Sequence, residues 1–160
     1  HIAFAKLEEI GKLKAIITQN IDGLHQAAGS KKVYELHGSV LRNYCMSCHE
    51  FYNEKSILES DGVPTCPKCG GAVKPDVVLY EEGLDDTVIK GAIDAISKAD
   101  TLIIGGTSLV VYPAAGLINY FKGKNLILIN KSSTTADNKA DLVIHESIGK
   151  VLGKAVNFLK

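Results

Sequence analysis

The sequence predicts an α/β fold: a Rossmann-like parallel sheet with helices on both faces, plus a small inserted zinc-ribbon module. Short apolar runs alternate with amphipathic stretches along most of the chain, which is typical of parallel strands covered by helices. The alternation is interrupted in the middle by a C-x2-C-x17-C-x2-C array formed by Cys45, Cys48, Cys66 and Cys69. Paired knuckles at this spacing are typical of a structural zinc site.

The first part of the chain predicts two helices and two strands. The apolar periodicity and the turn residues place them as a helix over 1–14, a buried strand over 15–18, a loop and short helix over 19–29 ended by Gly29, and a short strand over 33–36.

The second part begins with a turn-rich zinc segment at 41–73. The elements expected after it are an extended stretch at 77–80, a helix over 87–99, a buried strand over 101–104, a helix from Pro113, strands over 126–129 and 142–144, and a last helix whose apolar stripe is Ile148, Val151, Leu152, Ala155, Val156 and Leu159. We therefore expect a Rossmann-like domain at 1–40 and 74–160 and a zinc-binding module at 41–73.

The cysteine array predicts what the metal does. Four thiolates complete a tetrahedron around Zn²⁺ and leave no position open for a substrate. We expect one structural zinc per chain, and the chemistry must lie in the flanking segments.

Composition narrows the class of protein. The 160 residues are 46% hydrophobic, which is enough for a packed core, and 18 basic residues balance 18 acidic ones. This balance argues against a general basic field for binding nucleic acid, so we expect no sequence-specific nucleic-acid partner.

The segment at 101–121 is the longest uncharged run and is long enough to raise the question of a membrane span. Glycines 105 and 106 and Pro113 interrupt it, so a strand, a turn and a helix fit better. The amphipathic first residues do not resemble a signal peptide, and metal-spaced cysteines indicate a reducing compartment. We expect no membrane association and a cytoplasmic location.

Polar and small residues follow the predicted strands, where doubly wound folds bind ligands. Residues 19–25 follow the first strand, His37 and Gly38 the second, 105–108 the third, and Asn130 the fourth. Each also has a structural interpretation, because Asn and Asp form turns, Gly-Gly-Thr-Ser can be a tight turn with a helix cap, and a lone histidine is more often structural than catalytic. The chain has no G-x-G-x-x-G fingerprint.

Taken together, these motifs resemble the sirtuin family in content and order. The matching segments are TQNIDGLH at 18–25, LHG at 36–38, the two C-x2-C pairs, PDVV at 75–78, GTSL at 106–109 with Pro113-Ala114, and Ile129-Asn130. Sirtuins are NAD-dependent protein-lysine deacylases in which NAD+ and an acyl-lysine peptide enter a cleft from opposite sides. The resemblance implies transfer of an acyl group, with acetyl expected, from lysine to ADP-ribose with release of nicotinamide. Such an enzyme is a transferase, and it also acts as a hydrolase of the acyl-lysine amide.

The resemblance also implies a role for each matching residue. His37 matches the general base and Asn20 a second catalytic residue. The residues that match the NAD site are Gln19, Asn20, Ile21 and Asp22 around the nicotinamide and its ribose, Gly106, Thr107, Ser108 and Asn130 around the phosphates and adenosine ribose, and Ser147 and Ile148 near the adenine.

The peptide would lie as an added strand between 78–82 and 109–111. The residues that would line it are Val78, Tyr80, Glu82, Leu109 and Val111. Glu81 stands where the family usually has glycine, and an acidic rim there would favour basic peptides.

One part of the family pattern is missing from the 160 residues. The chain does not begin with methionine and contains only Met46, so we expect it to be a fragment with sequence upstream. Sirtuins begin with a strand, a Gly-Ala-Gly-x-Ser loop and a flexible loop that cradle the pyrophosphate. Without that strand the sheet would expose unpaired edges, so we expect the chain alone to be inactive and to bind NAD+ weakly or not at all.

Two other functions use some of the same features. A binding module could use the zinc ribbon to recruit partners, but it would not need Asn20, Asp22 and His37 together. Another NAD-using transferase, such as a mono-ADP-ribosyltransferase, would share the NAD residues and modify protein instead.

Overall fold

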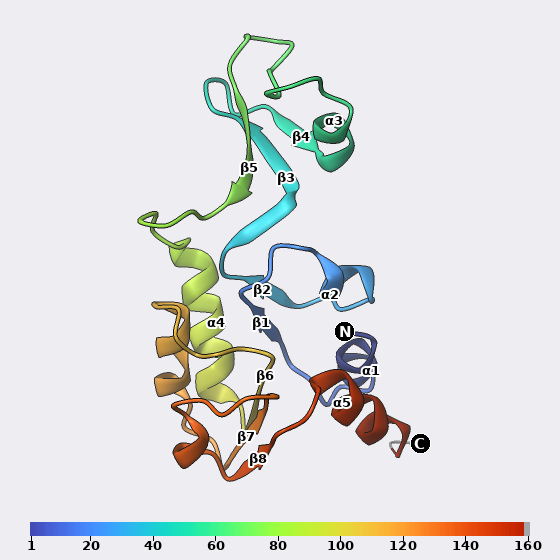
Figure 1. The fold of residues 1–160 in the computed structure, drawn as a ribbon, viewed down its shortest axis with the longest axis vertical. Coiled ribbons are helices and arrows are strands. Elements are labelled where there is room, and N and C mark those ends of the chain that lie inside the picture. Colours follow the sequence, from blue (N-terminus) through green and yellow to red (C-terminus); the bar gives the residue numbers. More distant parts are fainter. Residues whose placement is uncertain (159–160) are drawn as a thin grey trace.

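Parallel strands lie between helices, and an antiparallel sheet projects from one end of the molecule (Figure 1). The structure is a computed structural model that describes residues 1–158, so the predicted apolar position Leu159 lies outside the described residues. In chain order the elements are α1 (Ile2–Glu9), β1 (Ile16–Thr18), α2 (Leu24–Ala27), β2 (Val33–Glu35), β3 (Gly38–Cys45), β4 (Phe51–Asn53), α3 (Glu54–Leu58), β5 (Val73–Val77), α4 (Asp86–Lys98), β6 (Thr101–Gly105), the 3₁₀ helix η1 (Ala114–Tyr120), β7 (Asn125–Ile129), the 3₁₀ helix η2 (Asp137–Lys139), β8 (Leu142–Ile144) and α5 (Ile148–Asn157).

The predicted parallel strands are confirmed, but over the described residues they form two sheets instead of one. β1 pairs with β2 from Ile16 opposite Val33 onward, and β6, β7 and β8 form a second parallel sheet in that order. β6 has one neighbouring strand there, and all five of its residues are only half-buried. The expectation of a buried strand at 101–104 is therefore wrong, whereas β7 buries Leu128 and Ile129 as expected.

Helices cover both sides of the parallel strands. α4 begins where the Asp85 carboxylate accepts the N–H groups of Thr87 and Val88, an N-cap that satisfies two free donors. The apolar face of α4 contributes Ala92 and Ile96 to the main core, where they pack with Leu36, Ala114 and Leu117. α1 and α5 lie on the opposite side of the strands from α4 (Figure 1).

Two predicted helices differ from the structure in extent or type. α1 ends at Glu9 instead of residue 14, because Gly11 adopts a left-handed φ of 73° that ends the helical backbone. The segment after Pro113 is the 3₁₀ helix η1. No helix within residues 1–158 combines the length and apolar character needed to cross a membrane.

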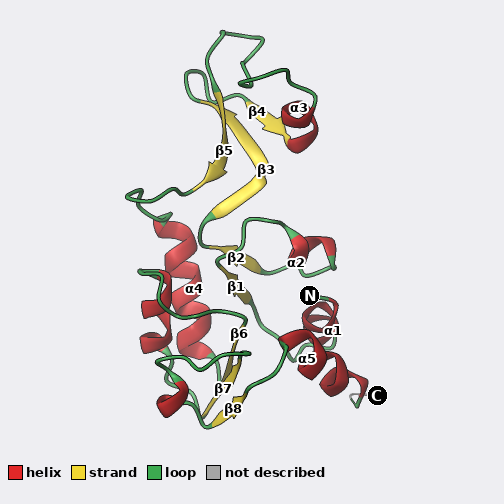
Figure 2. Ribbon diagram, viewed as in Figure 1, coloured by secondary structure: helices red, strands yellow, loops and turns green. Residues whose placement is uncertain are grey.

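The zinc segment contains more regular structure than its turn residues predicted. β4, β3 and β5 form an antiparallel sheet with α3 beside it (Figure 2). β3 and β5 extend beyond the expected limits of 41 and 73, since Gly38 pairs with Val77. The ladder shifts between Ser39 opposite Asp76 and Asn43 opposite Pro75, so residues 40–42 form a bulge on β3 with no partner on β5.

Candidate functional site

His37 lies between the end of β2 and the start of β3, where it contacts two other predicted site segments. Its ring Nδ1 is 2.9 Å from the carbonyl oxygen of Gln19. Its own carbonyl accepts the N–H of Val78 at 3.1 Å. A carbonyl oxygen can only accept, so a neutral His37 ring carries its proton on Nδ1 and keeps the Nε2 lone pair free.

The turn that places His37 depends on Gly38. This glycine has a φ of 74°, a region that L-residues rarely adopt. A Cβ atom at Gly38 would also overlap the carbonyl oxygen of Asp76 on β5. The backbone therefore passes from β2 to β3 at a point where both conformation and space require glycine.

The loop after β1 carries the residues predicted to lie around the nicotinamide. Its polar side chains are accessible: Asn20 and Asp22 are exposed, whereas Gln19 and Ile21 are half-buried. The Asp22 carboxylate accepts the N–H of Leu24 at 3.0 Å, so this residue also forms the local turn that begins α2. The Asn20 N–H donates to the Thr18 hydroxyl at 3.0 Å, which bends the chain away from β1.

A second group of predicted residues gathers at the carboxyl ends of β6 and β7. Gly106 has a φ of 65°, and a Cβ atom there would meet no heavy atom within 4 Å, so this backbone faces open space. The Thr107 hydroxyl accepts the N–H of Leu109 at 3.2 Å. Asn130 follows β7 directly, and its side-chain amide donates to the carbonyl of Ser132 at 2.9 Å.

The residues predicted for the adenine side lie at the start of α5, close to this loop. Ser147 precedes the first residue of α5, which is Ile148. The Ile148 side chain packs against the backbone of Gly105, so closely that a Cβ atom at Gly105 would overlap it. The structure thus brings Gly105, Gly106 and Ile148 close to one another.

The predicted peptide-binding segments are not strands in the structure. Residues 79–82 form a turn closed by the Glu82 N–H and the Leu79 carbonyl at 3.1 Å. Tyr80 is almost fully exposed, Val111 is exposed, and Val78 and Leu109 are half-buried.

Glu82 is engaged within its own chain. Its carboxylate accepts the N–H of Leu79 at 2.8 Å and pairs with Lys74 at 3.2 Å. The hydrogen bond from Leu79, followed by that from Lys74, lowers the pKa of Glu82. Glu82 therefore stabilises the turn, and Lys74 partly neutralises its charge.

Glu81 occupies a position in this turn that suits glycine. Its φ is 71°, in the left-handed region. A positive φ at the third residue is what a type II turn requires, which is why glycine is preferred there. The departure from the family's glycine thus leaves the turn in place with a strained residue in it.

One hollow in the described part of the chain lies away from these residues. It has a volume of about 270 Å³ between α4 and η1 and is lined by apolar side chains that include Ile93 and Leu117. It includes none of the predicted catalytic or NAD residues. A similar hollow between α1 and α5 includes Ile148.

The four cysteines converge at the tip of the antiparallel sheet. Their Sγ atoms all lie within 4.8 Å of one another, with 3.4 Å between Cys45 and Cys69 and 3.6 Å between Cys48 and Cys66. A tetrahedral ZnS₄ site with bonds of about 2.3 Å separates its sulfurs by about 3.8 Å. The geometry and the all-thiol ligand set therefore fit one structural zinc ion.

Hydrogen bonds favour the thiolate form at two of the four sulfurs, those of Cys45 and Cys66, whereas the neighbouring thiols raise the pKa of Cys48 and Cys69. The N–H groups of Cys48 and Ser47 lower the pKa of Cys45, and the Tyr52 hydroxyl, 3.1 Å from the Cys66 sulfur, lowers the pKa of Cys66 to about 6. Tyr52 is a neighbour of the metal ligands that the sequence did not identify, because no spacing rule points to an outer partner.

Comparison with known proteins identifies the arrangement. The model of the Sir2 family matches residues 1–113. The chain belongs to the Sir2 family. It is 82% identical to an NAD-dependent protein deacetylase of Clostridium perfringens over 158 residues, and 69% identical to one of Clostridium acetobutylicum over 153 residues.

These alignments cover 98% and 95% of this chain but 65% and 62% of the two relatives, so the chain spans less than two thirds of their length. Solved Sir2 structures agree closely in fold. One described as a Sir2–p53 peptide–NAD+ complex has a TM-score of 0.91 at 41% identity and is matched over 68% of its length. Another, with the inhibitor EX-527, 2′-O-acetyl-ADP-ribose and deacetylated p53 peptide, has a TM-score of 0.91 at 39% identity and is matched over 70%.

Proposed function

We propose that the full-length protein removes acyl groups, with acetyl expected, from protein lysines in an NAD-dependent reaction. The products would be the free lysine, nicotinamide and O-acyl-ADP-ribose. Support comes from family membership and from the names of the Clostridium relatives, which are NAD-dependent protein deacetylases. The observation that carries the proposal is the contact between the His37 Nδ1 and the Gln19 carbonyl.

That contact gives His37 the form a general base needs. With the proton held on Nδ1, Nε2 accepts the proton of a ribose hydroxyl while the ring stays fixed in orientation. NAD+ supplies the ADP-ribose that receives the acyl group and loses nicotinamide. The Asn20 and Asp22 side chains, exposed on the loop beside His37, would contact the nicotinamide end, with Gln19 and Ile21 beside them.

The remaining NAD contacts would come from the second parallel sheet. Gly106 offers an open, left-handed backbone of the kind that approaches phosphate closely. Thr107, Ser108 and Asn130 offer hydroxyl and amide groups for the phosphates and the adenosine ribose. Ser147 and Ile148 would border the adenine.

The acyl-lysine peptide would pair with the backbone near Val78 and near Val111, with Tyr80 over the acyl-lysine. Leu109, at the start of the second segment, has a left-handed φ of 55°, so that segment would have to become extended on binding. Glu82 would contribute indirectly by holding the turn that precedes α4. Backbone pairing of this kind gives affinity with limited side-chain selectivity. Glu81, exposed at the rim, would favour peptides with Lys or Arg beside the acyl-lysine.

We further propose a division into a Rossmann-like domain at 1–40 and 74–160 and a zinc module at 41–73, and a cytoplasmic location. Four unpaired thiols within metal-binding distance support a reducing compartment. A hydrolase classification rests on the same reaction, since the amide bond of the acyl-lysine is broken.

Product analysis tests the function. The full-length protein is incubated with NAD+ and an acetyl-lysine peptide, and the products are identified by mass spectrometry. 2′-O-acetyl-ADP-ribose and deacetylated peptide are expected. An ADP-ribosylated protein without acetyl-ADP-ribose would indicate the alternative transferase, and no NAD+ consumption at all would indicate a binding module.

The 160-residue chain is proposed to be inactive by itself. Within residues 1–158, β1 and β6 each pair with a single strand, so each has an open edge. Deacetylation by the isolated chain at a rate near that of the full-length protein would contradict this.

A further inference from the structure

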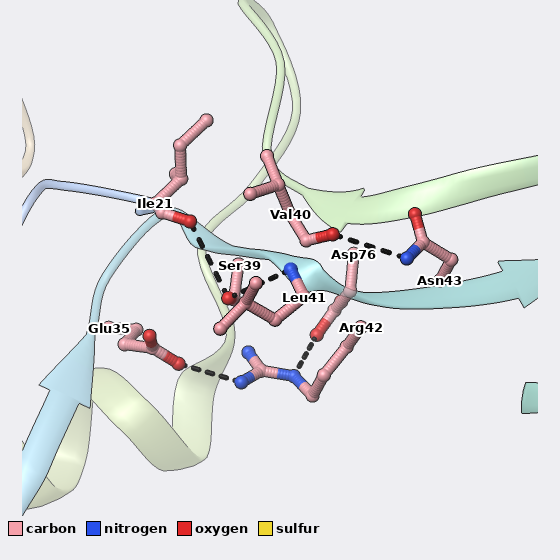
Figure 3. Close-up of polar contacts among 8 residues, drawn as sticks. All are labelled: Ile21, Glu35, Ser39, Val40, Leu41, Arg42, Asn43 and Asp76. Atoms are coloured by element: carbon pink, nitrogen blue, oxygen red, sulfur yellow. Dashed lines mark hydrogen bonds and ion pairs between the residues drawn. The ribbon is translucent and has the colours of Figure 1, made fainter. Parts of the chain in front are cut away.

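Arg42 joins three strands at the base of the zinc module. Its Nη1 donates to the Glu35 carboxylate at 2.7 Å, and its Nε donates to the Asp76 carboxylate at 2.9 Å (Figure 3). Glu35 is the last residue of β2, Arg42 lies on β3, and Asp76 lies on β5. One guanidinium therefore connects the first parallel sheet to both long strands of the antiparallel sheet.

The choice of residue fits this geometry. Arg42 is the only arginine in the 160 residues; the other 17 basic residues are lysines. A guanidinium presents several donors in a fixed plane and can serve two carboxylates in different directions, whereas an ammonium is a single point of charge. The Glu35 side chain is only 8% exposed, so its charge needs a partner close by.

Arg42 belongs to the bulge on β3 that has no partner on β5, and on the other side of β3 it pairs with Asn53 of β4. Residues 40–42 lie between two paired positions, and the buried Asn43 side chain donates to the Val40 carbonyl at 3.2 Å (Figure 3). The Leu41 N–H donates to the Ser39 hydroxyl at 3.2 Å. The bulge therefore has a defined internal structure instead of being a loose loop.

The bulge in turn contacts the loop predicted to bind the nicotinamide end. The Val40 N–H donates to the Ile21 carbonyl at 3.1 Å, and the Ser39 hydroxyl lies 3.5 Å from the same oxygen (Figure 3). Two residues before Ser39, His37 contacts the Gln19 carbonyl. The same short segment thus holds both the base and the loop beside it.

Two residues of the bridge lie close along the chain to His37 or to its backbone partner Val78. Glu35 precedes it by two residues, and Asp76 precedes Val78, whose N–H donates to the His37 carbonyl, by two residues. A shift of β3 relative to β2 and β5 would therefore displace His37 from Gln19 and from Val78 together.

We propose that the Glu35–Arg42–Asp76 bridge is a positioning device that fixes the β3 bulge, and through it the His37 ring, relative to the loop at 19–22. This inference rests on the proposed function, in which His37 acts after nicotinamide has left. A displaced base therefore slows formation of O-acyl-ADP-ribose but leaves the earlier release of nicotinamide unchanged.

The test compares two rates in the full-length, zinc-loaded protein: exchange of labelled nicotinamide into NAD+, and formation of O-acetyl-ADP-ribose. In Arg42→Met the ratio of product formation to exchange is expected to fall about tenfold or more, since small displacements of catalytic groups are costly. Arg42→Lys keeps the charge but makes a single contact, so its ratio is expected to lie between those of the wild type and Arg42→Met. Lys55→Met, which removes an exposed charge from the same module, should leave the ratio unchanged.

A merely structural role predicts a different result. Arg42→Met leaves the buried Glu35 carboxylate unpaired, which by itself lowers stability. The double variant Glu35→Gln/Arg42→Met removes that charge, so its melting temperature should recover while the ratio of the two rates stays low. If Arg42→Met does not fold, Asp76→Asn, which weakens one of the two contacts, gives the same comparison.

An unchanged ratio in folded Arg42→Met, Arg42→Lys and Asp76→Asn would overturn the inference, as would recovery of the ratio in the double variant. The proposed function fails separately, if the wild-type protein shows neither exchange nor product. Zinc content measured in every variant should remain one per chain, and its loss in proportion to activity would also count against positioning by the bridge.

Discussion

The Nδ1 nitrogen of His37 lies 2.9 Å from the carbonyl oxygen of Gln19. This contact joins the end of β2 to the loop after β1 and determines which ring nitrogen of a neutral His37 is free. We expect His37→Ala to lower deacetylation about 10²- to 10⁴-fold, the usual contribution of a general base. Circular dichroism should show an intact fold, because only one hydrogen bond, worth about 1 kcal/mol, is lost.

The matched control for this exchange is His49→Asn. His49 is exposed in the zinc knuckle and has a φ of 59°, a conformation that asparagine tolerates. The deacetylation rate of His49→Asn should equal that of the wild type. Comparable activity in His37→Ala would mean that His37 is not the base.

Zinc should be required for folding of the antiparallel sheet. Chelation or Cys66→Ser is expected to expose the amides of β3, β4 and β5 to hydrogen exchange, because a structural zinc ion supplies about 10–16 kcal/mol of binding free energy. Tyr52→Phe, which keeps all four ligands, should weaken zinc binding about tenfold, the low end for loss of an outer partner. Unchanged exchange in β3 after complete metal removal would contradict a structural role.

Substitution of Gly38 by alanine should destabilise the fold more than the same substitution at Gly11, which serves as the control. Both have left-handed φ angles, 74° and 73°, but only at Gly38 would a Cβ atom overlap the backbone. Gly11→Ala should lower the free energy of unfolding by about 1 kcal/mol through backbone strain. Gly38→Ala should cost about 3 kcal/mol or more, since overlap adds to the strain. Equal costs in denaturant titrations would show that β3 and β5 can separate easily at this point.

Glu81→Gly should stabilise the protein. The φ of 71° at Glu81 is strained for any residue with a Cβ atom, and glycine removes about 1–2 kcal/mol of that strain while adding about 0.5–1 kcal/mol of unfolded-state entropy. A modest rise in melting temperature is expected. Glu81→Ala removes the charge but keeps the Cβ atom, so it should give no rise. Equal effects of the two exchanges would assign the gain to charge instead of backbone.

Glu8 should make stability depend on pH in a predictable direction. Its carboxylate accepts the N–H groups of Lys31 and Lys32, both at 2.8 Å, and these hydrogen bonds lower the pKa of Glu8 below its usual 4.5. The folded state then binds its proton less tightly than the unfolded state. The stabilisation is fully present above pH 4.5 and is lost as the pH falls through the lowered pKa.

The expected measurement is a melting temperature for Glu8→Gln that is below the wild type at pH 7 and approaches it under acid conditions. Glu9→Gln, at the exposed neighbouring position, should follow the wild type throughout. A constant difference between Glu8→Gln and the wild type across this range would show that the hydrogen bonds to Lys31 and Lys32 do not depend on ionisation.

The elements that could be predicted from the sequence are those whose signal lies within a few neighbouring residues. The apolar runs that became β1, β2, β7 and β8, and the capped amphipathic helix α4, are each readable within a few residues, and the cysteine spacing predicted the thiol cluster. β3 was missed, although it is among the longest strands, because Ser39 to Cys45 does not alternate and its pairing is interrupted by the bulge.

Features that depend on distant partners could not be predicted. The role of Arg42 requires knowing that β2 and β5 flank β3, and Tyr52 is recognisable only once it lies beside Cys66. The separation of the parallel strands into two sheets also follows from pairings, not from any one run of residues.

The loop after β1 is held from the β3 side by its main chain alone: the carbonyl of Gln19 accepts from His37, and the carbonyl of Ile21 accepts from Val40. These two contacts do not involve the side chains at 19 and 21. A protein engineer could enlarge or shrink those two side chains to accommodate a modified dinucleotide, leaving the imidazole where it is. In the proposed function this loop would contact the nicotinamide end, so the backbone anchoring would make it a place to build an enzyme that uses a synthetic co-substrate.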